Sequence, residues 1–284
     1  MPHQEPEPPI TRAPRDGPRA VATIATVATV ATVATIARYT AAEALHNRVL
    51  VSALVTIVAG VALGQFAGEL ALTDTRGISA AAQAWLFRIA AVFLIASFAI
   101  SSLVREADDK GLELLLALPL PRAGYLFGKW GGCTLVAAIL TALFALPLLS
   151  VAPWTAVSAW AISLFFELAI VASASLLCAL TFTHLVASLA AVSAFYILAR
   201  TMAALLAIGG SPVVPQDSTA FRFAAALLEG IGALLPRLDR FCRSDWLTTG
   251  AAAWAEMPWL AAQTVVYVSL LLAAAYVDLM RKSV

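Results

Sequence analysis

The charged residues best placed for binding or chemistry gather in one segment between two long apolar runs. Residues 105–110 carry two basic and three acidic side chains, and a leucine-rich stretch with Leu115 and Leu116 follows. Its apolar residues recur at helical spacing, and Pro119 ends the pattern because the residue before a proline avoids helical angles. Such charges are costly in lipid, so we expect this segment at a membrane surface. It is either a docking element for another protein or a solvated loop.

Three more charged residues, Arg88, Glu167 and Arg200, interrupt runs that are otherwise apolar. Ionisable side chains inside a membrane usually pair with one another or face a water-filled space. At a rise of about 1.5 Å per residue, all three fall at similar depths in the outer half of a bilayer. We therefore expect Glu167 to pair with Arg200, Arg88 or both. The pair would be a polar lining or gate in a transport path, or a brace between helices.

Other chemistry finds no support in the sequence. Three cysteines and three histidines are scattered, without the spacing of a disulfide framework or a metal site. No Gly-x-Ser-x-Gly or His-Glu-x-x-His motif is present, and the Gly128-Lys129-Trp130 run lacks the remaining residues of a phosphate loop. We therefore expect no cofactor, no metal and no ATPase activity of the chain itself.

The composition indicates a membrane protein. The chain is 61% hydrophobic and 12% charged, whereas soluble domains are about 45–50% apolar and about 25% charged. The net charge of +1 gives no sign of nucleic-acid binding.

Six apolar stretches are long enough, at about 20 residues, to cross a bilayer as helices. They cover roughly residues 49–68, 84–104, 130–152, 156–181, 185–209 and 258–278. Pro147 and Pro153 should kink or end the third of them. The sequence thus predicts an all-α, polytopic membrane protein with six transmembrane helices.

The distribution of lysine and arginine sets the expected orientation, because cytoplasmic ends of spans are enriched in both. Basic residues lie next to the first, second, third and sixth spans, and with six spans they all fall on one side of the membrane. This bias places both termini in the cytoplasm. The residues are Arg38, Arg48, Arg105, Lys110, Arg122, Lys129, Arg281 and Lys282.

A shorter apolar run, Phe221 to Leu235, lies on the outer side before the last span. About 15 residues are too few to cross, so we expect a re-entrant half-helix in the outer leaflet. Gly230, Gly232 and Pro236 would break or bend it.

The N-terminal part differs in character from the rest. Residues 1–36 form a tail: residues 1–19 have the composition of a disordered segment, and residues 21–36 repeat Val/Ile-Ala-Thr with period three. This repeat is a tandem expansion, a signal-peptide core or a marginal extra span. Thr40-Ala-Ala-Glu43 has the pattern of a capping box and predicts an amphipathic helix, Ala41 to Arg48, lying flat in the cytoplasmic interface.

Gly60, Gly64 and Gly68 form a double Gly-x-x-x-Gly ridge on the first span. Ridges of small residues let helix backbones approach closely. The partner would be another span of the same chain or a second copy.

The charged segment also carries a sequence of motifs: Arg105-Glu106, a Gly-x-Glu-x-Leu-Leu core that includes Gly111, Glu113, Leu115 and Leu116, the Pro119 to Arg122 turn, and Gly128-Lys129. This order resembles the signature of the type-2 ABC transporter permeases, a family that includes the permease for maturation of nitrous-oxide reductase. The similarity extends to the six-span layout and covers roughly residues 37–284, but not the N-terminal tail.

The resemblance implies a permease domain in a bacterial inner membrane, paired with a second permease subunit as a homo- or heterodimer. A separate ABC ATPase subunit would bind the loop between the second and third spans. Arg105, Glu106, Gly111, Glu113, Leu115, Leu116, Pro119 and Arg122 would form this contact. The chain would export a substrate that the sequence does not specify, in contact with membrane lipid and without binding nucleic acid. The alternatives are a non-transporting membrane anchor or assembly factor and, less favoured, an intramembrane enzyme built around Glu167.

Overall fold

The computed structural model describes residues 33–44, 49–71, 74–108, 122–182, 184–209, 219–249 and 253–281. Every regular element within these ranges is a helix. Six of them are long and apolar enough to cross a membrane, so the prediction of an all-α, multi-pass membrane protein with six spans is confirmed. The six helices are α2 (Val49–Glu69), α3 (Thr75–Asp108), α5 (Arg122–Leu148), α6 (Trp154–Thr181), α7 (Leu185–Gly209) and α10 (Ala253–Arg281).

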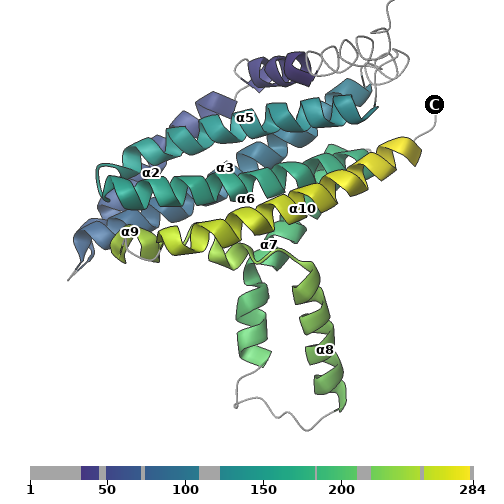
Figure 1. Cartoon of the computed structure of the whole chain (residues 1–284). Coiled ribbons are helices and arrows are strands. Elements are labelled where there is room, and N and C mark those ends of the chain that lie inside the picture. The colour runs from purple at the N-terminus through teal and green to yellow at the C-terminus, as the bar shows by residue number, and fades with distance from the viewer. Residues whose placement is uncertain are drawn as a thin grey trace, which may run out of the picture.

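The bundle is built around α3 and α6, which pack on one another and on most of the other long helices (Figure 1). Two thirds of the most apolar window of each is buried inside the protein, whereas α2, α7 and α10 bury less than a third of theirs. The inner helices therefore hold the core, and the outer three present apolar surface to lipid.

Two helices extend well beyond the predicted spans. α3 begins at Thr75 instead of residue 84, and α5 begins at Arg122 instead of residue 130. The start of α3 is capped by Asp74, whose Oδ1 accepts a hydrogen bond of 3.0 Å from the backbone N–H of Gly77. Hydropathy marks the part of a helix that lies in lipid, so it misses the polar turns that continue the same helix into water.

The prolines at the end of the third span act as expected. Pro147 lies in the last turn of α5, which ends at Leu148, and Pro153 precedes the first residue of α6. Backbone hydrogen bonds from Ser150 and Val151 to Pro147 and Leu148 close the turn between the two helices.

The glycine ridge of α2 packs on α3 of the same chain. A Cβ atom at Gly60 would collide with the ring of Phe87, and one at Gly64 would collide with Gln83. Gly68 lies against Thr75 in the same way, with 3.2 Å from a Cβ to the Thr75 Cγ2 atom. Of the two partners that the sequence left open, the structure places this ridge against a span of the same chain.

The capping-box prediction at Thr40 is wrong. Residues 33–44 form one continuous helix, so Thr40 lies in its interior and is buried, with 1% of its surface exposed. The helix also takes the last four residues that we assigned to the N-terminal tail. Residues 45–48, the second half of the predicted helix, lie outside the described ranges, and its location in the membrane interface stays a prediction.

The helix of residues 33–44 lies against α5 (Figure 1). Gly128 and Gly132 form the contact: a Cβ at Gly132 would lie 2.5 Å from the Cβ of Thr40, and one at Gly128 would lie 2.9 Å from that of Ile36. The glycine face of α5 therefore lets the backbone of this helix approach closely.

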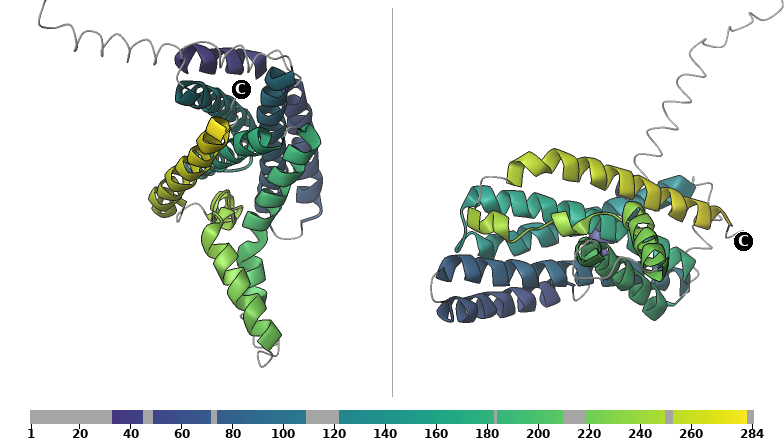
Figure 2. Two further views of the ribbon diagram at one scale, coloured as in Figure 1. Left: turned by 90° about the vertical axis from the view of Figure 1, so that its right-hand side faces the viewer. Right: turned by 90° about the horizontal axis from the view of Figure 1, so that it is seen from below.

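The short apolar run before the last span forms α8 (Thr219–Leu234), which packs on the C-terminal half of α7 and projects with it from the bundle (Figures 1 and 2). Gly230 and Gly232 lie inside this helix, so the expected break at the glycines is wrong. The helix ends two residues before Pro236, as a proline favours. Its insertion into the outer leaflet stays a prediction.

After α8 the chain returns to the bundle through an irregular stretch with two short helices, η1 (Leu238–Arg240) and α9 (Asp245–Thr249). Leu238, Phe241 and Cys242 of this stretch are buried. We call residues 238–242 the return segment.

Candidate functional site

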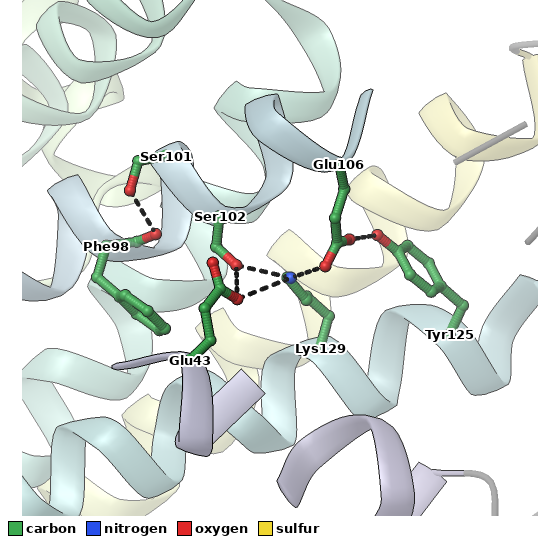
Figure 3. A network of polar contacts seen from close by, with 7 residues as sticks. All are labelled: Glu43, Phe98, Ser101, Ser102, Glu106, Tyr125 and Lys129. Carbon is green, nitrogen blue, oxygen red and sulfur yellow. Dashed lines mark hydrogen bonds and ion pairs between the residues drawn. The ribbon is translucent and has the colours of Figure 1, made fainter. Parts of the chain in front are cut away.

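A polar cluster joins three helices at the end of the bundle where the chain leaves α3 and enters α5 (Figure 3). We call this the loop end, and the cluster of Glu43, Ser102, Glu106, Tyr125 and Lys129 the loop-end cluster. Ser102 and Glu106 are four residues apart on α3, and Tyr125 and Lys129 are four apart on α5. Residues at this spacing share a helix face, so each helix presents two polar groups to the other. The helix of residues 33–44 adds Glu43.

Lys129 is the centre of the cluster, although only 1% of its surface is exposed. Its Nζ atom forms an ion pair with Glu106, donates a hydrogen bond of 2.8 Å to Ser102 Oγ, and lies 4.0 Å from Glu43 Oε2. A buried ammonium is tolerated only when it is paired and hydrogen-bonded, and these partners meet that condition.

The remaining hydrogen bonds connect the partners of Lys129. Ser102 Oγ donates to Glu43 Oε2 at 2.6 Å, and the Tyr125 hydroxyl donates to Glu106 Oε2. A continuous chain of polar contacts thus runs from Glu43 through Ser102, Lys129 and Glu106 to Tyr125. With two carboxylates and one ammonium, the cluster carries a formal charge of −1.

The contact between Ser102 and Lys129 resembles the serine–lysine pairs that some hydrolases use for nucleophilic attack. Such a pair needs an amine free to accept a proton and a hydroxyl open to a substrate. Here Glu106 pairs with the ammonium, the Ser102 hydroxyl donates to Glu43, and Ser102 is buried. The contacts of Ser102 and Lys129 therefore hold helices together and do not provide a nucleophile that is open to a substrate.

The described residues among the predicted coupling residues lie in or near the loop-end cluster. Glu106 lies inside the cluster, whereas its neighbour Arg105 lines a cleft on another side of α3. Arg122, the first residue of α5, donates from Nη1 to the backbone carbonyl of Leu279 at 3.3 Å and approaches Met280 Sδ at 4.0 Å. It thereby satisfies a carbonyl in the last turn of α10. The other predicted coupling residues, Gly111, Glu113, Leu115, Leu116 and Pro119, lie outside the described residues.

A second polar cluster lies within the bundle. Arg200 Nη1 is 3.6 Å from Glu167 Oε1, and the Tyr196 hydroxyl donates to the same oxygen at 2.8 Å. Glu167 is fully buried. The expected partner of Glu167 is therefore present in Arg200, while Arg88 is engaged elsewhere.

Both arginines bind backbone carbonyls of the return segment. Arg88 Nη1 donates to the carbonyl of Cys242 at 3.2 Å, and Arg200 Nη1 donates to those of Leu238 and Phe241, the second at 2.9 Å. The backbone N–H of Cys242 donates to Ser163 Oγ at 3.0 Å. Irregular backbone within a membrane is tolerated only where protein groups satisfy it. This arrangement favours the brace over the gate, because the charges are used to hold a buried turn.

The second cluster keeps unused hydrogen-bonding capacity. Glu167 Oε2, Arg88 Nε and Trp160 Nε1 are buried, and none of the three has a hydrogen-bond partner in the described part of the chain. A buried polar atom without a partner costs free energy, so the described part of the chain satisfies this cluster only in part.

Ser102, Tyr125 and the return segment were not predicted from the sequence to be functional, and Glu43 and Gly128 were predicted only as parts of motifs. Two signals could have found the loop-end cluster. Gly128 and Gly132 form a Gly-x-x-x-Gly ridge, and Ser102 with Glu106 and Tyr125 with Lys129 form polar pairs at helical spacing. No such signal marked the backbone carbonyls that Arg88 and Arg200 bind, because residues 238–242 are far from both arginines in the sequence and only the fold brings them together.

Comparison of the chain with known protein families and with curated proteins gives no match. No group of three or more histidine, cysteine or acidic residues in the described ranges is arranged to hold a metal ion.

Proposed function

We propose that this chain is the membrane-spanning permease subunit of an ATP-driven ABC exporter of the type-2 class. A separate nucleotide-binding subunit would hydrolyse ATP and bind the connection between α3 and α5. A second permease subunit would complete the transport path. In this proposal the protein lies in a bacterial inner membrane with both termini in the cytoplasm, so the loop end faces the ATPase.

The observation that carries the proposal is that both ends of the α3–α5 connection are attached to other helices. On the α3 side, Glu106 is tied to Lys129 and Tyr125 of α5, and the same cluster reaches Glu43. On the α5 side, Arg122 is tied to the end of α10. A force applied to the connection would therefore reach α3, α5, α10 and the helix of residues 33–44 together.

The motif order of residues 105–129 supports the same proposal and assigns the contact itself to the leucines between these anchors. Apolar leucines that ended in solvent would be unfavourable, whereas a partner protein would bury them. The closure of two ATPase subunits would then move the anchored helix ends and bias the membrane part between inward-open and outward-open states.

The test is ATPase stimulation in liposomes that contain the chain and its candidate ATPase. The variant L115A/L116A removes the proposed contact. The matched control is L146A/L149A, which changes two exposed leucines at the opposite end of α5. We expect the control to stimulate ATP hydrolysis like the unchanged protein and L115A/L116A to lose at least about tenfold of the stimulation, since burial of each leucine contributes about 1.5–3 kcal/mol.

Two outcomes would overturn the proposal in different ways. Full stimulation by L115A/L116A would show that the leucines are not the contact. Copurification with the ATPase without any effect on its rate would favour the non-transporting anchor.

A further inference from the structure

A second site lies at the loop end, on the side of α3 away from the loop-end cluster. A cleft of about 260 Å³ opens there between α2, α3 and α7. Both α2 and α7 pack on α3 (Figure 2). The wall of the cleft is a stripe of α3, and Val49 and Ser52 of α2 and Leu185 and Leu189 of α7 form its flanks.

The stripe changes in polarity along the helix. Arg105, Ser101, Ser97 and Phe93 follow at intervals of four residues, so they share one face of α3 over about 18 Å. The guanidinium is outermost and exposed, two hydroxyls come next, and the phenyl ring of Phe93 is deepest along the membrane axis. This order of cation, hydroxyls and apolar surface is the order of groups that an anionic amphiphile in a membrane would need.

Two of these groups have binding capacity that the described part of the protein leaves unused. Ser97 Oγ is buried and has no hydrogen-bond partner there, and the Arg105 guanidinium forms no ion pair there. Ser101 donates to the carbonyl of Phe98 at 3.1 Å, on the side of α3 away from Lys129 (Figure 3), and its oxygen can still accept.

The size of the cleft restricts the occupant. Pockets that enclose a whole drug-sized ligand measure about 300–1,000 Å³, so this cleft, at about 260 Å³, is too small to enclose a larger molecule completely. Its rim is open to the surroundings, because Phe93 and Leu185 are exposed. A long amphiphile in the cleft would therefore extend outward past Arg105 into the headgroup region and inward along the apolar helix surface.

We propose that the cleft binds one anionic phospholipid from the leaflet at the loop end. The phosphate would pair with Arg105, an ester carbonyl of the glycerol part would accept a hydrogen bond from Ser97, and an acyl chain would lie against Phe93, Leu94 and Leu189. Charge complementarity with Arg105 selects an anionic headgroup over a zwitterionic one. This site is separate from the loop-end cluster and does not depend on an ATPase partner.

The test uses the purified full chain in detergent, titrated with phosphatidylglycerol, phosphatidylcholine or inorganic phosphate. Bound lipid is counted by native mass spectrometry, and the unfolding temperature is measured in parallel. The variants are R105Q, which removes the cation, and S97L, which fills the cleft. The control is R76Q, which makes the same charge change on an exposed residue at the opposite end of α3.

We expect the unchanged protein and R76Q to bind phosphatidylglycerol with equal affinity and to be stabilised by it. R105Q should bind about tenfold or more weakly, and S97L should lose this binding. If S97L fails to fold, S97A replaces it, with an expected loss of about threefold to tenfold because one hydrogen bond is removed.

Several results would overturn the proposal. R105Q and the Ser97 variant could bind phosphatidylglycerol like the unchanged protein, phosphatidylcholine could bind equally well, or inorganic phosphate alone could give the same stabilisation. If S97L instead dissociated a dimer without changing lipid binding, the occupant would be a second copy of the chain. The binding measurements contain no ATPase, so none of these results tests the contact of Leu115 and Leu116 with it.

Discussion

At the scale of single residues, removal of the Lys129 ammonium from the loop-end cluster would leave two negative charges close together. K129M would leave Glu43 and Glu106 without their common cation, in a site where Lys129 itself is buried. Removing one partner of a buried pair costs about 3–5 kcal/mol, and because Glu43 and Glu106 are each about a quarter exposed, we expect the lower half of this range. The unfolding temperature in detergent should fall by about 5 °C or more.

A double-mutant cycle tests whether the loss comes from the pair. E106Q removes one of the two carboxylates, so E106Q/K129M should be less destabilised than the sum of the single variants. Additive changes in unfolding temperature would show that Lys129 and Glu106 are not energetically coupled.

The second cluster predicts an asymmetry between the two members of its ion pair. R200M would leave the buried Glu167 carboxylate without its cation, and would free the carbonyls of Leu238 and Phe241. E167Q keeps an acceptor for Tyr196 and leaves Arg200 bonded to the return segment. We therefore expect R200M to reduce the yield of folded protein severalfold and E167Q to change it by less than about twofold.

Size-exclusion chromatography of the detergent extract measures this yield. A larger defect in E167Q than in R200M would contradict the brace. An E167Q protein that folds normally but no longer stimulates the ATPase would favour a role of Glu167 in a gate over its role in a brace.

At the scale of elements, the approach of the helix of residues 33–44 to α5 depends on Gly132. G132L would place a side chain where Thr40 lies, and the displaced helix would uncover Lys129. The matched control is G131A, because a Cβ at Gly131 would lie 3.7 Å from the Cβ of Ala37, an ordinary contact distance. An amine-reactive reagent followed by mass spectrometry should modify Lys129 in G132L but not in G131A or the unchanged protein. Equal protection of Lys129 in all three would mean that the helix does not cover it.

The elements also show what sequence patterns can and cannot predict. The six spans follow from hydropathy, because crossing a bilayer requires about 20 apolar residues in one helix. The capping box at Thr40 failed because threonine and glutamate three residues apart also share a helix face. Thr40 packs on Gly132, and Glu43 accepts from Ser102. The same two residue types therefore fit a helix start and a packed polar face equally well.

The contents of the candidate site were predictable to a similar degree. Glu167 is the one acidic residue in the interior of the predicted spans, since Asp278 is the last residue of the sixth span, and a partner among the two arginines was therefore the natural expectation. The carbonyls that these arginines also bind were not predictable, because every residue has a carbonyl and only the fold selects the three in use. Pairing within the loop-end cluster likewise depends on the register between α3 and α5.

At the scale of the whole molecule, the proposed orientation places residue 110 and residue 243 on opposite sides of the membrane. A membrane-impermeant maleimide applied to intact cells should label R243C and not K110C, and inverted vesicles should give the reverse. Cys178 is partly exposed, so the test is made in a C178S background, in which Cys133 and Cys242 are buried and burial raises the pKa of the Cys242 thiol, which keeps it protonated and unreactive at neutral pH. Labelling of K110C in intact cells would show that the topology is the reverse of the proposed one and would rule out the ATPase contact.

The unequal lengths of α2 and α3 have a consequence for the choice of host bilayer. With 21 residues, α2 is about 32 Å long, close to the hydrocarbon thickness of about 30 Å, whereas the 34 residues of α3 extend over about 51 Å. A thicker bilayer can be matched by α3 through a smaller tilt, but α2 has no spare length and ends at the charged Glu69. Because the glycine ridge fixes α2 to α3, lipids with longer acyl chains would have to thin locally around α2 or slide the two helices past each other.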